Sequence, residues 1–153
     1  MRRSDREISE IHTIEKILAE ALVCRLAMVD NGEPYVVPLN YGYRDGTLFF
    51  HSAAHGRKVD ILRSGGRICC EVTLENGVYR NDNPCDWGCY FQTVIGYGTP
   101  FFIETAAEKR EALAIIMAQY SVGTFAFPDA AIARVAVFSV KIDSMTAKEY
   151  RPI

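Results

Sequence analysis

The chain has 153 residues, of which 49% are hydrophobic, and its formal net charge is -2. This length can bury one core and is too short for two, so we expect a single domain over residues 1–153. The balanced charge argues against nucleic acid as a partner. No stretch reaches the ~18 apolar residues of a membrane span, so we expect no membrane partner and a cytoplasmic location.

The first half of the chain predicts a helix followed by strands. Apolar residues recur at three- and four-residue spacing from Ile8 to Leu22, which is typical of an amphipathic helix. Strand-like segments then cover 25–29, 34–43 and 47–51, and the turn signals Asp30-Asn31-Gly32 and Asp45-Gly46 separate them. We therefore expect three strands in an antiparallel meander.

The second half of the chain also predicts both helices and strands. It predicts a short helix over 58–63, strands over 67–74, 90–103 and 132–142, and a helix capped by Thr105 with Glu108 as its capping-box partner. Gly96 and Gly98 predict a bulge or a close backbone approach. The segment 75–88 carries the only tryptophan and is a candidate functional loop. The expected fold is α+β and mainly β, with about six strands around a small closed or split barrel.

The cysteines predict free thiols. Their number is five, which is odd, and the chain is large enough to need no disulfides, so a reducing compartment is expected. Cys85 and Cys89 could be combined with His51 and His55 into a zinc site, but their C-x3-C spacing is unusual for zinc. We expect no metal.

The most distinctive local feature is the turn Ser52-Ala53-Ala54-His55-Gly56-Arg57-Lys58, between a predicted strand and a predicted helix. A helix N-terminus offers unpaired N–H groups and a positive dipole end, and Ser52, Arg57 and Lys58 add a hydroxyl and two cations. This combination suits a phosphate. An exposed turn with an ordinary solvated Arg-Lys pair would have the same sequence, so the local residues leave both interpretations open.

A wider pattern favours phosphate binding. Tyr35 to Tyr41, Leu48 to Ala53 and Gly56 to Leu62 together resemble the FMN-binding split-barrel superfamily of pyridoxamine 5'-phosphate oxidase-like proteins, and most closely the nitroimidazole-resistance (Nim) type of flavoprotein. Tyr90 to Gly98 is similar to the next marked strand of that family. The resemblance spans about residues 1 to 145. It implies a six-stranded antiparallel split β-barrel with flanking helices, and a homodimer with FMN at the subunit interface.

The resemblance also assigns roles to residues. It places Val37, Pro38, Leu39, Asn40 and Tyr41 along the flavin ring and ribityl chain, and His51, Ser52 and Ala53 beside the isoalloxazine and ribityl region. It places Gly56, Arg57 and Lys58 at the phosphate, and Gln92, Thr93 and Val94 against the flavin of the partner subunit. The family often has serine where this chain has Gly56. The basic C-terminal segment of true pyridoxamine-phosphate oxidases has no counterpart before Ile153, so pyridoxine chemistry is not expected.

The resemblance implies an FMN-dependent oxidoreductase that reduces small acceptors such as nitroaromatics. His51 is the candidate catalytic residue, because an imidazole near a flavin can donate a proton at neutral pH. A hydrogen-bonded strand histidine without a catalytic role is the alternative. Two other functions stay open: a flavin-binding or sensing module without turnover, and a haem-binding split barrel with His12, His51 or His55 as ligand.

Overall fold

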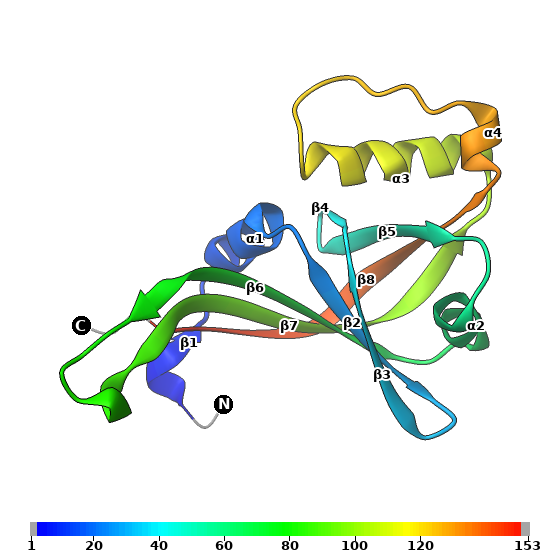
Figure 1. Ribbon diagram of the computed structural model, residues 1–153. Coiled ribbons are helices and arrows are strands. Elements are labelled where there is room, and N and C mark those ends of the chain that lie inside the picture. Colours follow the sequence, from blue (N-terminus) through cyan, green and yellow to red (C-terminus); the bar gives the residue numbers. More distant parts are fainter. Residues whose placement is uncertain (1–2, 151–153) are drawn as a thin grey trace.

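The computed structural model describes residues 3–150, so the C-terminal Arg151-Pro152-Ile153 lies outside the described residues. Eight strands form one antiparallel sheet that is wrapped into a split barrel (Figure 1). The strands are β1 (Glu7–Ile8), β2 (Cys24–Asp30), β3 (Glu33–Leu39), β4 (Gly42–Arg44), β5 (Thr47–Ala53), β6 (Ile68–Tyr79), β7 (Gly88–Ile103) and β8 (Val135–Tyr150). The helices are α1 (Ile11–Glu20), α2 (Arg57–Ser64), α3 (Ala106–Ala118) and α4 (Asp129–Ile132), with 3-10 turns η1 (Ser4–Arg6) and η2 (Pro84–Asp86).

The sheet is closed by a very short connection. Its strand order is β3-β2-β6-β7-β8-β5-β4, with β1 added beside β8, so β3 and β4 are its two edges. Only Asn40 and Tyr41 separate these strands in the chain. Three Cα steps span at most about 11 Å, so the two edges must approach each other there. This connection turns an open sheet into a barrel.

The expected α+β, mainly β split barrel is confirmed, with eight strands where about six were expected, but the predicted three-strand meander is wrong. The predicted strand 34–43 is two strands, β3 and β4, which pair at opposite edges, so the three-strand meander does not exist. The break has a physical cause in Tyr41, whose side chain is fully buried. Its hydroxyl donates to the Leu18 carbonyl at 2.5 Å, and its N–H donates to the Tyr120 hydroxyl at 2.9 Å.

Other predicted boundaries shift for similar reasons. Ile8 belongs to β1 because it pairs with Ala147, so the first helix begins only at Ile11. β6 continues to Tyr79, which makes a strand of the first part of the predicted loop 75–88. The last strand starts at Val135, because Ile132 ends α4, and it runs on to Tyr150.

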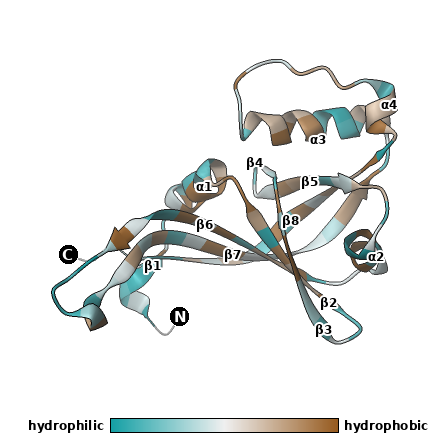
Figure 2. Cartoon of the chain, viewed as in Figure 1, coloured by the Kyte–Doolittle hydropathy of each residue, from teal (hydrophilic) through white to brown (hydrophobic). Residues whose placement is uncertain are grey.

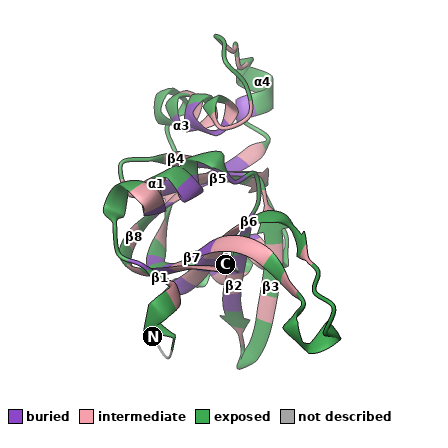
Figure 3. Ribbon diagram, turned by 90° about the vertical axis from the view of Figure 1, so that its left-hand side faces the viewer, coloured by how far each residue is buried: buried purple, intermediate pink, exposed green. Residues whose placement is uncertain are grey.

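The core lies inside the barrel and under its helices. Figures 2 and 3 show apolar and buried residues on the inner faces of the strands and on the sheet-facing sides of α1 and α3. Phe50 and Phe138 stack at its centre with ring centroids 5.1 Å apart. A second cluster, with Ile103, Ala112 and Val137, lies between α3 and the sheet.

Two local predictions are confirmed. Thr105 caps α3, since its hydroxyl accepts from the Glu108 N–H at 3.3 Å. The β7–β8 register shifts between Tyr97 and Gly98, and a side chain at Gly98 would collide with the backbone of Lys141. Within residues 3–150, none of the helices is long and apolar enough to cross a membrane.

Candidate functional site

The turn between β5 and α2 has the backbone of an anion site. α2 begins at Arg57, and its N-cap Gly56 supplies no side-chain hydrogen bond to the first turn. The first N–H groups of the helix are therefore left for another acceptor. Gly56 has φ +121°, a conformation that side chains rarely adopt. The geometry explains why glycine rather than serine suits this position.

A cavity of about 210 Å3 opens at this turn. Its lining consists of Tyr35, Ser52, Ala53, His55, Gly56, Arg57, Lys58 and Val59. Most of the predicted phosphate residues therefore share one hollow. Tyr35 joins them from β3, a strand distant in sequence. The Ser52 hydroxyl donates to the Ala53 carbonyl at 2.9 Å, so it must exchange this bond before it can donate to a phosphate.

Arg57 is held by acidic residues. Its Nε lies 2.7 Å from Asp30 Oδ2 and its Nη2 lies 3.2 Å from Glu33 Oε2. The guanidinium also lies over the Tyr35 ring, 4.6 Å from the centroid. The hydrogen bond to Asp30 raises the pKa of Arg57, with Glu33 contributing. The positive charge of Arg57 is thus largely compensated before any ligand arrives.

Lys58 differs from its neighbour. Its side chain is half-buried, and among residues 3–150 no carboxylate forms an ion pair with it. Burial lowers the pKa of Lys58 from its usual value. A desolvated cation without a counter-ion is stabilised by an incoming anion. Lys58 is therefore the better candidate of the two basic residues for a phosphate.

His51 and Ser52 leave β5 on opposite sides. Leu48 and Phe50 are buried, so strand alternation puts Ser52 on the barrel side and His51 on the outer side. Burial, with Lys58 as a further cause, lowers the pKa of His51. The imidazole is therefore mainly neutral at pH 7, which makes it a weaker proton source than an imidazolium.

The residues from Val37 to Tyr41 divide between the surface and the core. Val37 and Leu39 are partly buried against the core, whereas Pro38 and Asn40 are exposed. The Tyr41 side chain is inside the barrel. The whole residue, backbone included, is 0% exposed, so Tyr41 does not reach a ligand on the surface.

Gln92, Thr93 and Val94 lie on another part of the barrel. Thr93 pairs with Lys148 of β8, whereas Ser52 pairs with Ala136 near the opposite end of the same strand. The side chain of Val94 is buried in the core. Within one chain, the predicted phosphate residues of the turn therefore lie close together, whereas residues 92–94 lie far from them.

Thr93 belongs to a small polar network. Its hydroxyl lies 3.0 Å from Glu71 Oε1 and 2.7 Å from the Thr73 hydroxyl. Burial acts to raise the pKa of Glu71, but hydrogen bonds from Thr73, Arg25 and Thr93 outweigh burial and lower it. The Gln92 amide donates to Glu149 Oε2 at 3.0 Å. These contacts fix the side chains of Thr93 and Gln92, which point to opposite faces of β7 because they are neighbours in the strand.

The remaining histidines and cysteines do not assemble into a centre. Among residues 3–150, no three His, Cys, Asp or Glu side chains lie close enough to hold a metal ion. His12 is exposed on α1, 3.7 Å from Glu15, and His55 is exposed in the turn. All five cysteines are free.

Sequence reasoning missed three residues of the site, Asp30, Glu33 and Tyr35. Asp30 was part of a turn signal and Glu33 follows that turn, so their local pattern indicated only a hairpin. Tyr35 begins the first segment of the family pattern, which was the one available signal. Their contact with Arg57 depends on how the β2–β3 hairpin lies against α2, which no local pattern specifies.

Comparison with known proteins agrees with this architecture. The family model described as pyridoxamine 5'-phosphate oxidase matches residues 10–149. A proposed 5-nitroimidazole antibiotic resistance protein from Bacteroides thetaiotaomicron is 35% identical over 94% of this chain and 86% of that chain, with a TM-score of 0.82. Among curated proteins the sequence has no significant match.

Two more distant structures share the fold. The flavocytochrome Anf3 from Azotobacter vinelandii has 22% identity and a TM-score of 0.87, over 99% of this chain and 72% of that chain. The FAD and heme binding protein from Mycobacterium smegmatis has 18% identity and a TM-score of 0.88, over 96% and 74%. From the family model and the 35% identical relative together, the chain is a member of the pyridoxamine 5'-phosphate oxidase-like family.

Proposed function

We propose that the protein binds a flavin, with FMN as the cofactor, and reduces small acceptors such as nitroaromatics. The observation that carries the proposal is Lys58, a half-buried cation without an ion-pair partner in the described chain, beside a helix N-terminus that lacks a side-chain cap. Both groups line the same cavity. Such a site matches a phosphate monoester.

A bound flavin supplies the hydride and electron chemistry, so the protein's task is to bind and orient it. Lys58, the N–H groups of α2 and the Ser52 hydroxyl would hold the phosphate. Beyond Phe49, β5 has no partner on its β4 side, so the edge of residues 51–53 is open to a ligand. His51 would lie beside that ligand on the outer face of the strand.

We further propose a homodimer that completes the site. Gln92, Thr93 and Val94 are too far along β8 from the turn to meet the same ligand within one chain. In a homodimer, residues 92–94 of the second copy would contact the flavin that is bound at the turn of the first. Exposed apolar side chains on the barrel surface, such as Phe101 with 72% exposure, are suited to such an interface. The five free cysteines favour a reducing compartment, and we propose the cytoplasm.

The absorbance spectrum of the purified protein tests the cofactor. A flavin spectrum that is bleached by dithionite and restored by a nitroaromatic supports the full proposal. A flavin spectrum without any turnover favours a carrier or sensing module, and a Soret band favours haem. Sedimentation of the flavin-loaded and flavin-free protein tests the homodimer, because a loaded monomer would contradict it.

A further inference from the structure

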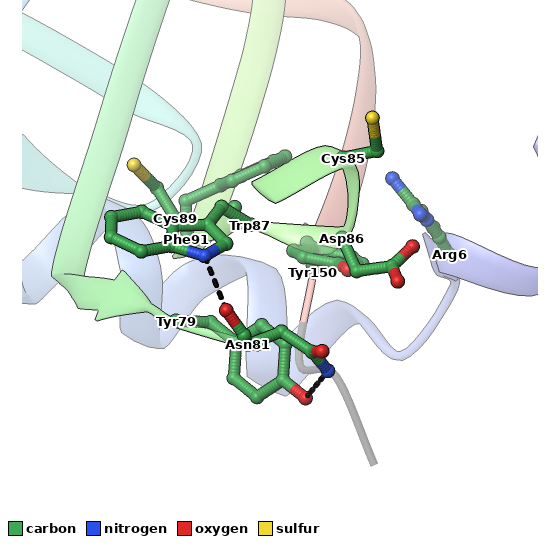
Figure 4. A pocket seen from close by; sticks show the side chains of 10 residues that line it. Arg6, Tyr79, Asn81, Cys85, Asp86, Trp87, Cys89, Phe91 and Tyr150 are labelled. Carbon is green, nitrogen blue, oxygen red and sulfur yellow. Dashed lines mark hydrogen bonds between the residues drawn. The ribbon is translucent and has the colours of Figure 1, made fainter. Parts of the chain in front are cut away.

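A second cavity, of about 540 Å3, lies at the tip of the β6–β7 hairpin (Figure 4). Four aromatic side chains line it: Tyr79, Trp87, Phe91 and Tyr150. Arg6 of η1 faces it from the side, beside Asp86. We call this cavity the aromatic pocket. Its volume is in the range of small-molecule sites, and it is on a different part of the barrel from the phosphate turn.

The rings of the aromatic pocket are fixed by contacts within the hairpin. Trp87 Nε1 donates to the Asn81 carbonyl at 2.7 Å, and the Asn81 amide donates to the Tyr79 hydroxyl at 3.0 Å (Figure 4). Tyr150 packs onto Gly88, where an added Cβ would come within 2.8 Å of the ring. The pocket is therefore formed before a ligand arrives, although 49% of Trp87 remains exposed.

The chemistry of this lining selects a ligand class. Electron-rich aromatic rings carry negative charge on their faces, so they attract planar rings whose faces are electron-poor. Arg6 adds a guanidinium 4.1 Å from the centroid of the Tyr150 ring, where it can pair with a negatively polarised oxygen. A nitro group provides both features, an electron-poor ring and two such oxygens.

The pocket is also continuous with the segment that we propose to contact the flavin. Phe91 and Thr93 lie on the same face of β7, because side chains two residues apart in a strand point the same way. The face of β7 that carries Phe91 thus continues to Thr93, whereas Gln92 lies on the opposite face. A ligand held by Phe91 is positioned beside that segment.

We propose that the aromatic pocket is the binding site for the electron-poor aromatic acceptor, held between Trp87, Phe91 and Tyr150 and oriented by Arg6. The assignment of this ligand as the acceptor rests on the proposed function. Binding itself does not require the flavin, so the two proposals fail separately.

Trp87 makes a direct test possible, because it is the only tryptophan in the chain. The flavin-free full-length protein is titrated with a nitroimidazole while Trp87 fluorescence and its lifetime are recorded. Saturable quenching with an unchanged lifetime is expected. Phe91→Ala should weaken the apparent affinity about tenfold, whereas Tyr97→Ala, a change at an exposed aromatic residue on the same strand outside the pocket, should leave it unchanged. Arg6→Gln, a change at a partly exposed side chain, should weaken it several-fold, and the far-UV circular dichroism of the variant checks that the fold is kept.

Several results would overturn the assignment. Quenching that rises linearly with nitroimidazole and shortens the lifetime equally in all variants would mean random collision with an exposed indole. Binding that occurs only after flavin is added would place the acceptor elsewhere. Saturating competition by riboflavin would assign the pocket to the cofactor. A flavin spectrum that is absent from the protein would contradict the proposed function, yet it would leave this titration interpretable.

Discussion

The turn between β5 and α2 and the aromatic pocket differ in both their chemistry and their construction. The turn is a charged site built mainly from one continuous segment, residues 52–59, to which Tyr35 adds a wall, while Asp30 and Glu33 hold Arg57. The aromatic pocket combines rings from the β6–β7 hairpin and the end of β8 with the guanidinium of Arg6 in η1. A continuous site depends on local backbone geometry, whereas a discontinuous one depends on strand register. The two regions should therefore respond separately to mutation.

The largest effect is expected from the double variant Arg57→Ala and Lys58→Ala. Loss of charge-assisted contacts of about 1.5–3 kcal/mol each should reduce FMN affinity by roughly 100-fold or more. Quenching of Trp87 by a nitroimidazole should not change in the flavin-free protein. FMN and nitroimidazole titrations of the same sample measure both. Parallel loss of the two affinities would show that the regions are not separate.

Single variants sharpen the comparison within the turn. Lys58→Met should lose about tenfold more FMN affinity than Arg57→Met, because Asp30 and Glu33 already compensate Arg57. Riboflavin, which lacks the phosphate, should bind equally to both variants and serves as the control. Equal losses from the two substitutions would mean that Arg57 leaves its acidic partners when FMN binds.

The pH dependence of binding follows from Lys58. Its pKa in the free protein is lowered by burial, and a bound phosphate would raise it again. The ratio of FMN affinity to riboflavin affinity should therefore be constant at neutral pH. As the pH rises, this ratio should begin to fall at a pH lower than the usual pKa of lysine. Titrations between neutral and alkaline pH measure this ratio. Nitroimidazole binding at the aromatic pocket should not follow the same curve.

The smallest effect is expected from Asp30→Asn combined with Glu33→Gln. Removing two negative charges near a phosphate dianion should raise FMN affinity by up to about fivefold, a small effect because solvent screens the exposed Glu33 and reaches the partly buried Asp30. Riboflavin affinity should stay the same. A fall in FMN affinity would indicate instead that the two carboxylates position the Arg57 guanidinium for the phosphate.

The sequence predicted the elements better than their pairing. The short helix, the Thr105 cap and the bulge at Gly98 depend on residues within a few positions, and all three are confirmed. The split of the strand at Asn40-Tyr41 depends on contacts of Tyr41 with Leu18 and Tyr120, which are distant in the chain. Periodicity over ten residues contains no information about such contacts.

In the two candidate sites, too, contacts between residues that are distant in the chain could not be predicted from the sequence. The turn residues were identified because they form one motif, but the acidic partners of Arg57 were not. The candidate loop 75–88 contains Trp87, which does line the aromatic pocket. Tyr79 and Tyr150 reach the pocket through the pairing of β6, β7 and β8.

The position of β8 in the sheet has a consequence for how the protein is made. β8 pairs with β1, β5 and β7, which include segments more than a hundred residues earlier in the chain. Contacts of such separation form slowly, because a long loop must close first. During synthesis the earlier strands would wait, with an open sheet edge, until β8 leaves the ribosome. The barrel is then completed in one late step, and the nascent chain is exposed to misassociation until that moment.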